Sequence, residues 1–116
     1  MAQRRLSREE ARQRTRQSIL QTSRELFSQR GYRGASIEEI AETAGYSKGA
    51  FYSNWPSKEA LFLELLDQER TDSNIWNSGR ADTPAGWALA TLDFFLEAVH
   101  SPQTRAALAE RYQQAR

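Results

Sequence analysis

The chain has 116 residues, a mean hydropathy of -0.76 and 27% charged residues, which describe one small soluble domain, with or without an appendage. No apolar run approaches the roughly 18–20 residues that a membrane span requires, and the lack of cysteine excludes disulfides and thiolate metal ligands. These features predict a protein of the reducing cytoplasm.

The net charge of +1 is unevenly distributed along the chain. Residues 1–35 hold nine arginines and three glutamates, a charge of +6, whereas the rest of the chain holds seven basic and twelve acidic residues, a charge of -5. This asymmetry indicates either a nucleic-acid partner for the basic part or a solvated basic helix face.

Residues 1–12 are expected to form a flexible basic arm and the start of the first helix. The first six residues show no periodicity. Ser7 and Glu10 have the spacing of a capping box, which predicts that a helix begins just after Ser7. Apolar residues then recur at helical spacing until Gly31, which ends the helix, and Tyr32 is expected to fold back onto the helix end.

Residues 36–55 carry the signals of two short helices joined by a tight turn. Ser36 and Glu39 have the spacing of a second capping box. Gly45 lies where the chain must adopt a left-handed backbone to leave the first of these helices, and Ser47 is a cap for the second.

The second short helix is expected to rest on a three-helix core. Phe51 and Trp55, four residues apart, face inward from it and leave small and polar residues on its other sides. Two helices joined by a glycine turn, with the second projecting from a rigid body, are the layout of a DNA-binding helix-turn-helix. The residues expected in this core are Ile19, Leu20, Leu26, Phe27, Ile37, Ile40, Ala41, Ala44, Phe51 and Trp55.

The rest of the chain predicts three more helices and no strands. Ser57 follows a proline, and Thr83 and Ser101 each precede one, which gives three helix starts. The first of these helices is long, because nothing breaks it before Gly79. The second, over residues 84–99, is apolar on more than one face and must be covered. We therefore expect an all-α fold: a three-helix helix-turn-helix domain followed by a longer linking helix and two further helices.

Four ordered groups of residues, without gaps between the matched positions, carry a family resemblance. They are Thr15-Arg16-x-x-Ile19-Leu20, Leu26-Phe27-x-x-x-Gly31-Tyr32, Ser36-Ile37-x-x-Ile40-Ala41-x-x-Ala44-Gly45-x-Ser47-Lys48-Gly49-x-Phe51-Tyr52, and Trp55-x-Ser57-Lys58-Glu59-x-Leu61. This set resembles the tetracycline-repressor (TetR) family of bacterial transcriptional regulators over about residues 13–70. The resemblance implies a DNA-binding domain over residues 13–72, with its helix-turn-helix at about 36–55. Residues 73–116 would be a partial C-terminal helical regulatory or dimerisation region, because members of the family have a much longer one.

The resemblance also implies binding of double-stranded DNA at a palindromic operator by a homodimer. Lys48 can pair with a guanine edge or a phosphate, and Gly49 and Ala50 lack bulk, so that the backbone can approach the groove. By resemblance, Tyr52 and Lys58 contact phosphates. The expected DNA-binding residues are Thr15, Arg16, Ser36, Ser47, Lys48, Gly49, Ala50, Tyr52, Asn54 and Lys58.

Two positions depart from the family pattern. Glu38 replaces a residue that is a base-reading arginine in some relatives, and we expect it to be solvated without that contact. Asn54 stands where many relatives carry histidine or tyrosine, and its amide can bond either adenine or a phosphate.

The expected function is that of a sequence-specific DNA-binding regulator, a repressor released from DNA by a small apolar effector. Trp87, Phe94 and Phe95 are candidates for contact with the effector, although simple packing against the preceding helix explains them too. Two alternatives stay open: a truncated family member that pairs with a full-length relative and blocks it, and a structural DNA-binding protein without an effector.

The sequence offers nothing for catalysis or for a cofactor. It has no nucleophile–base pair and no glycine-rich phosphate loop, and its single histidine, His100, has no other metal ligand at suitable spacing. We expect neither an enzyme nor a metal site.

Overall fold

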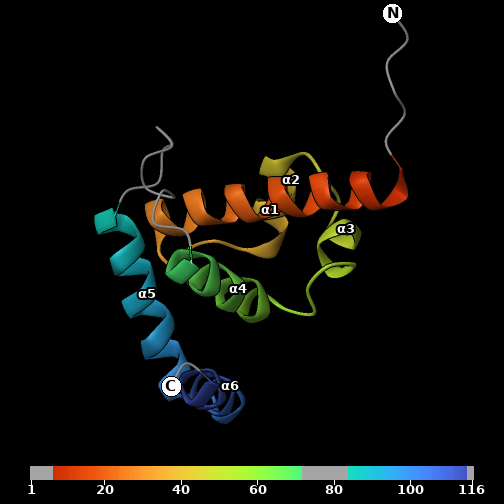
Figure 1. Ribbon diagram of the computed structural model, residues 1–116. Coiled ribbons are helices and arrows are strands. Elements are labelled where there is room, and N and C mark those ends of the chain that lie inside the picture. The colour runs from red at the N-terminus through yellow and green to blue at the C-terminus, as the bar shows by residue number, and fades with distance from the viewer. Residues whose placement is uncertain (1–6, 72–83, 115–116) are drawn as a thin grey trace, which may run out of the picture.

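The computed structural model describes residues 7–71 and 84–114, although only the backbone is described at residues 69–71, 84, 111, 112 and 114. Within these residues it contains helices and no strands (Figure 1), which confirms the predicted all-α fold. None of these helices is long and apolar enough to cross a bilayer. The helices are α1 (Arg8–Arg30), α2 (Ile37–Ala44), α3 (Lys48–Tyr52), α4 (Lys58–Thr71), α5 (Pro84–Val99) and α6 (Pro102–Gln114).

The two predicted capping boxes have different outcomes. At the start of α1, Ser7 and Glu10 exchange both hydrogen bonds, so this box is confirmed. At the start of α2, the Ser36 hydroxyl accepts from the backbone N–H of Glu39 at 3.0 Å. The Glu39 carboxylate, however, pairs with Arg30 instead of turning back to the cap. The second box is therefore half formed, because its carboxylate ties α2 to the end of α1.

The other predicted helix starts follow the same chemistry. Ser47, Ser57 and Ser101 each accept a hydrogen bond from the backbone N–H three residues further on, at 3.1, 3.1 and 3.3 Å. These bonds satisfy N–H groups that have no partner within a helix. The predicted cap at Thr83 and the predicted break at Gly79 lie outside the described residues.

Two glycines with positive φ end the first two helices. Gly31 (φ 80°) donates its N–H to the carbonyl of Phe27 at 2.8 Å, and Tyr32 folds back so that its ring lies 5.7 Å from that of Phe27. Gly45 (φ 86°, ψ 26°) has the left-handed conformation predicted for it. Both helix ends were therefore correctly located from the sequence.

The first four helices close one core. Most of the predicted members are buried, whereas Ile37 and Ala44, near the two ends of α2, are only partly buried. The loop between α1 and α2 adds Tyr32 and Ala35, which the sequence did not predict as core. The buried hydrophobic residues of these helices are Ile19, Leu20, Leu26, Phe27, Ile40, Ala41, Phe51, Leu61, Phe62, Leu63 and Leu65, with Trp55 just beyond α3.

Helix α5 packs against this core through aromatic rings. The ring of Phe62 on α4 lies 4.9 Å from that of Trp87 and 4.5 Å from that of Phe94, both nearly parallel to it. Tyr32 completes the cluster, with ring centres 5.1 Å from Phe62 and 4.9 Å from Phe94. The aromatic residues of α5 thus extend the core of the first four helices.

An ion pair also stabilises the packing of α5 against the first four helices. The backbone N–H and the Nε of Arg33 each donate to the carboxylate of Asp93 at 2.7 Å, and Glu97 lies 3.9 Å from the same guanidinium. Burial raises the pKa of Asp93, but the hydrogen bonds and charge of Arg33 outweigh it, so the pKa lies below its usual value. The charged form of Asp93 is therefore favoured, and it joins α5 to the loop that follows α1.

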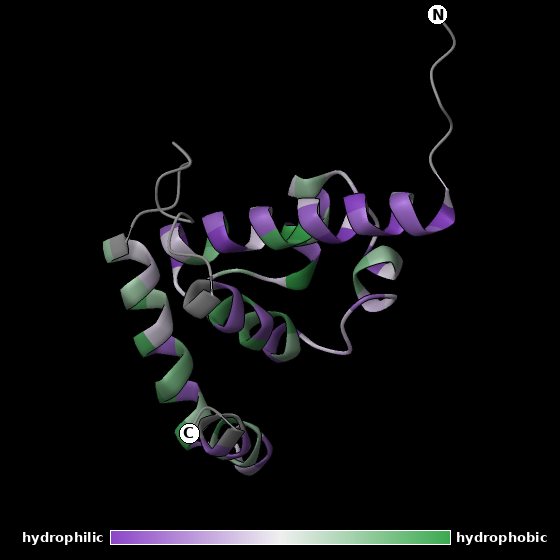
Figure 2. Cartoon of the chain, in the orientation of Figure 1, coloured by the Kyte–Doolittle hydropathy of each residue, from purple (hydrophilic) through white to green (hydrophobic). Residues whose placement is uncertain are grey.

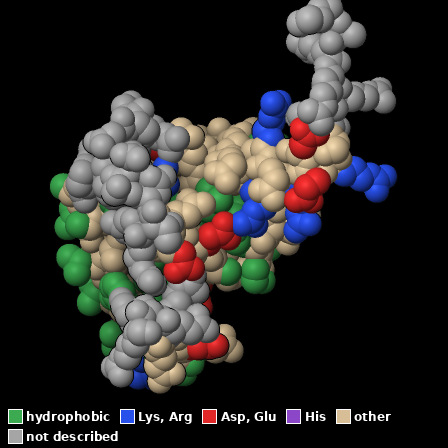
Figure 3. Space-filling model, in the orientation of Figure 1, with side chains coloured by type: hydrophobic (Ala, Val, Ile, Leu, Met, Phe, Trp, Pro, Cys, Tyr) green, Lys and Arg blue, Asp and Glu red, His purple; other side chains and the backbone are tan. Residues whose placement is uncertain are grey.

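The opposite face of α5 is exposed. Leu89, Leu92, Leu96 and Val99 retain 59% to 66% of their accessible surface, and we call these four residues the α5 stripe. Figure 2 shows α5 as a largely hydrophobic helix, and Figure 3 shows hydrophobic side chains gathered along the edge of the molecule over α5. The prediction that this helix is apolar on more than one face is confirmed, and within residues 7–71 and 84–114 nothing covers the stripe.

Candidate nucleic-acid interface

The turn between α2 and α3 holds the second helix in place. Gly45 supplies the left-handed residue, and the N–H of Tyr46 donates to the carbonyl of Ala41 at 2.9 Å. Phe51 is fully buried and anchors α3, and Trp55, just beyond its end, is buried beside it with ring centres 5.5 Å apart. A helix of five residues is thereby fixed on a rigid body.

The outer face of α3 is exposed to solvent. Ser47, Lys48, Gly49 and Tyr52 are exposed, and Ala50 is partly buried. A Cβ added at Gly49 would meet nothing closer than the hydroxyl of Ser47, at 3.6 Å, so the fold itself does not require glycine there. Tyr52 keeps half of its surface exposed. Of the residues predicted to face the groove, Lys48 and Gly49 are exposed, whereas Ala50 and Asn54 are partly buried.

Lys48 has a partner on α2. Its Nζ donates to a carboxylate oxygen of Glu38 at 2.8 Å, and the two side chains are 52% and 62% exposed. The hydrogen bond lowers the pKa of Glu38 and raises that of Lys48. Glu38 was expected to be merely solvated, but it lies at the same surface as Lys48 and binds it. We call these two residues the Glu38–Lys48 pair.

Asn54 is engaged within the protein. Its amide nitrogen donates to the carbonyl of Ala50 at 3.0 Å, and its oxygen lies 3.5 Å from the Nε of Arg12 on α1. Arg12 is exposed and lies beside the end of α3. Arg12 was not among the predicted contacts, although its spacing of four residues from Arg16 places both on one face of α1.

Arg16 lies in a network rather than on an open surface. Its guanidinium pairs with Glu64 on α4 and lies 4.8 Å from the ring centre of Trp55. The other oxygen of Glu64 accepts from the indole N–H of Trp55 at 2.9 Å. The hydroxyl of Thr15 donates to the carbonyl of Ala11 at 3.0 Å. Both predicted contacts on α1 therefore have partners inside the protein, and Arg16 joins α1 to α4.

Lys58, at the start of α4, turns inward. Its ammonium donates to the carbonyls of Tyr32 and Ala35 at 2.9 and 3.1 Å and lies 4.4 Å from the ring centre of Tyr32. Burial lowers the pKa of Lys58, with the carboxylates of Glu97 and Asp93 acting in the opposite direction. Since an ammonium has three N–H donors, the two carbonyls account for two of them.

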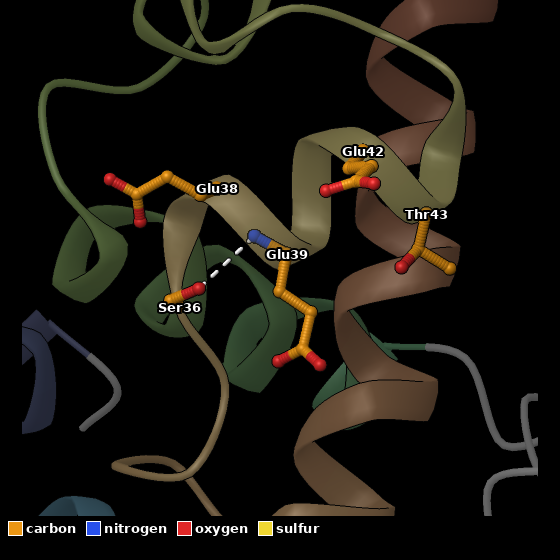
Figure 4. A pocket seen from close by; sticks show the side chains of 5 residues that line it. All are labelled: Ser36, Glu38, Glu39, Glu42 and Thr43. Atoms are coloured by element: carbon orange, nitrogen blue, oxygen red, sulfur yellow. Dashed lines mark hydrogen bonds between the residues drawn. The ribbon is translucent and has the colours of Figure 1, made fainter.

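Ser36 borders a shallow acidic hollow on α2 (Figure 4). The hollow is lined by Ser36, Glu38, Glu39, Glu42 and Thr43. In Figure 4, Glu38 projects from α2 on the opposite side from Thr43. The carboxylates make this hollow unsuitable for a phosphate. Among the described residues no group of three or more His, Cys, Asp or Glu side chains is arranged to hold a metal ion.

The three candidate effector residues are not on one accessible surface. Trp87 and Phe94 are buried against Phe62, whereas Phe95 is partly buried, with its ring 5.9 Å from that of Phe94. An apolar ligand would have to separate packed rings to reach the first two. The basic residues of the arm, up to residue 6, lie outside the described part of the chain.

Residues 19–65 match the family model described as bacterial regulatory proteins, tetR family. The chain is 44% identical over 69 residues to an uncharacterized HTH-type transcriptional regulator, YuxN, of Bacillus subtilis, which covers 57% of this chain and 24% of YuxN. It is 41% identical over 54 residues to the HTH-type transcriptional repressor AcnR of Corynebacterium diphtheriae, covering 47% of this chain and 28% of AcnR.

Two comparisons reach further along the chain. The HTH-type transcriptional regulator EthR of Mycobacterium tuberculosis is 32% identical over 102 residues, which cover 81% of this chain and 47% of EthR. A crystal structure of a transcriptional regulator (TerR/AcrR family) from Aquifex aeolicus superimposes with a TM-score of 0.54 at 29% identity, covering 87% of this chain and 66% of that one. The chain thus spans less than half the length of the curated relatives named here.

Proposed function

Because this chain belongs to the tetR family of bacterial regulatory proteins, we propose that it binds duplex DNA sequence-specifically and regulates transcription. The observation that carries the proposal is the bare face of α3, with Lys48, Gly49 and Tyr52 exposed on a helix anchored by the buried Phe51. A short helix held on a rigid body is the element that enters a major groove.

The exposed residues of α3 suit different parts of a duplex. Lys48 reaches a guanine edge or a phosphate, and the methyl group of Ala50 suits a thymine methyl. Gly49 permits close approach, since it has no side chain and is exposed. Tyr52 is placed to donate to a phosphate, a contact that positions the protein without reading sequence. Arg12, beside the end of α3, is a second candidate for the phosphates.

The experiment begins with footprinting on the DNA beside the protein's own gene, followed by fluorescence anisotropy on the protected site. With about five phosphates neutralised per half-site, the log–log salt slope should be about -4 to -5 per half-site. Lys48→Ala should weaken the preferred site by about 1–3 kcal/mol. Arg105→Ala removes the same charge from an exposed position on α6 and should change nothing. A wild-type protein without a preferred site would refute the proposal.

We also propose that the active species is a homodimer paired through the α5 stripe. Leu89, Leu92, Leu96 and Val99 follow one another at intervals of three, four and three residues, the spacing of a seam between two helices. A palindromic operator requires two copies of the chain. Helix α5, which carries the stripe, lies near the opposite end of α1 from α3 (Figure 1), so a second copy seated there leaves both α3 helices free.

Sedimentation tests the pairing. The double variant Leu92→Glu, Leu96→Glu should be monomeric, because it places four carboxylates in the proposed seam of a dimer. Ala106→Glu, at an exposed position of α6, is the control and should leave the dimer intact. A wild-type monomer that binds no apolar dye would refute pairing through the stripe, and a monomer that pairs only with a longer relative would favour an interfering partner instead.

Repression controlled by a small apolar effector is the finer part of the proposal. Its support is the density of aromatic residues on α5, of which Phe95 is partly buried at the edge of the core. Titration with apolar ligands should quench tryptophan fluorescence saturably and should release DNA. Loss of the quenching in Trp87→Leu would support a site near that ring, whereas quenching that this substitution leaves unchanged would contradict it.

A further inference from the structure

The Glu38–Lys48 pair lies where α2 and α3 meet the proposed DNA surface. One member comes from each helix, and their charged atoms are 2.8 Å apart. The neighbouring Glu39 instead reaches Arg30 on α1, and Glu42 lies one helical turn after Glu38 (Figure 4). Wherever α3 carries Lys48 in a groove, the Glu38 carboxylate is carried with it.

The two side chains have complementary chemistry. An ammonium only donates hydrogen bonds, and an ionised carboxylate only accepts them. In the major groove a G·C pair presents the N7 and O6 acceptors of guanine followed by the N4 donor of cytosine, whereas an A·T pair presents an acceptor, a donor, an acceptor and a methyl group. A cation beside an anion therefore matches the whole edge of a G·C pair and only part of an A·T edge.

We propose that the Glu38–Lys48 pair reads one G·C base pair in each half-site, with Lys48 over guanine and Glu38 over cytosine. The proposal rests on the proposed DNA binding and adds Glu38 as a specificity-determining residue. Because each side chain comes from a different helix, the pair cannot exchange places. A reversed C·G pair would set the ammonium against the N4 donor and the carboxylate against the guanine acceptors.

The same carboxylate should weaken binding to DNA in general. Glu38 adds a negative charge beside the phosphates and occupies Lys48, which would otherwise neutralise one. An exposed ion pair is worth little in the free protein, so both groups can turn toward a base pair at small cost. Removal of Glu38 should therefore affect two quantities in opposite directions: affinity for random DNA rises, while discrimination at one base pair falls.

The test compares the wild type with Glu38→Ala and Glu42→Ala. Glu42 is exposed on the same helix, so its substitution removes the same charge away from Lys48. Sites selected from random DNA identify the preferred operator, and anisotropy then measures binding to that operator and to versions with one G·C pair reversed. Circular dichroism confirms that each variant is folded.

The wild type should prefer G·C over its reversal by about 5- to 150-fold at one position of each half-site. Glu38→Ala should lose most of that preference and bind random DNA more tightly, whereas Glu42→Ala should keep the preference. Identical selected sequences and equal ratios for wild type and Glu38→Ala would overturn the assignment while leaving DNA binding intact. A wild type without any preferred sequence would overturn both proposals.

Discussion

Phe62 is the residue on which the attachment of α5 to the DNA-binding helices depends. It is fully buried on α4, and its ring contacts those of Tyr32, Trp87 and Phe94 at 5.1, 4.9 and 4.5 Å between centres. Truncation of a buried phenylalanine to alanine costs about 3–5 kcal/mol through lost burial and the cavity left behind. The three aromatic pairs add about 0.5–1.5 kcal/mol each, so we expect Phe62→Ala to lose at least about 5 kcal/mol.

Urea unfolding followed by tryptophan fluorescence and circular dichroism measures this loss. The free energy of unfolding of a small domain is about 5–15 kcal/mol, so the Phe62→Ala variant should be close to unfolding. Phe62→Leu keeps part of the apolar volume but loses the three ring pairs, so it should lose about 1.5–4.5 kcal/mol. Tyr52→Ala is the control, since it removes a ring that is half exposed and should cost about 1 kcal/mol or less. A loss below about 2 kcal/mol in Phe62→Ala would refute the role of the cluster.

Four further predictions follow from single residues. Gly45→Ala should cost about 1–2 kcal/mol because φ is positive there. Gly49→Ala should stabilise the fold by about 0.5–1 kcal/mol yet weaken DNA binding. Thermal melts measure the stability and anisotropy measures the DNA affinity, and a variant in which both rise or both fall would contradict this prediction. Burial raises the pKa of Asp93, but Arg33 brings the net pKa below its usual value, so the stabilisation from the charged form should disappear as the pH falls below about 3.9. The melting temperatures of wild type and Asp93→Asn should therefore converge in acid. A difference between the two that stays constant with pH would contradict this prediction. Lys58→Ala leaves two carbonyls unpaired and should lower the free energy of unfolding by about 1–3 kcal/mol. If the log–log salt slope of DNA binding also becomes flatter by about one, Lys58 contacts a phosphate as well. An unchanged slope would leave Lys58 with its structural role alone.

The helix boundaries were predictable because their causes are local. A capping serine accepts a hydrogen bond from the N–H three residues further on, and a glycine with positive φ ends the helix that it follows. The roles of Ser7, Ser47 and Gly45 could therefore be predicted from the neighbouring sequence alone. The inward face of α3 was predictable for the same reason, since Phe51 and Trp55 are one helical turn apart. Most of the core of the first four helices follows from such periodicities.

Partners that are distant in the sequence were not predictable in this way. Arg16 and Glu64 are 48 residues apart, and only the packing of α1 on α4 brings them together. The capping role assigned to Glu39 failed because Arg30, across a turn that contains two glycines, offers a stronger partner than a backbone N–H. The two faces of α5 were visible in the sequence, but its docking through Arg33 and Asp93, 60 residues apart, was not.

The expected DNA contacts divide into two groups according to what the fold does with them. Lys48, Gly49 and Tyr52 are exposed and carry little of the structure, so substitutions there should change DNA binding while changing stability by about 1 kcal/mol at most. Arg16 binds Glu64 and Trp55, and Lys58 binds two carbonyls of the loop between α1 and α2, so their substitutions change stability together with any contact to DNA. A loss of binding in the second group therefore has meaning only beside an unfolding curve, whereas a changed base preference in the first group can be assigned to readout directly.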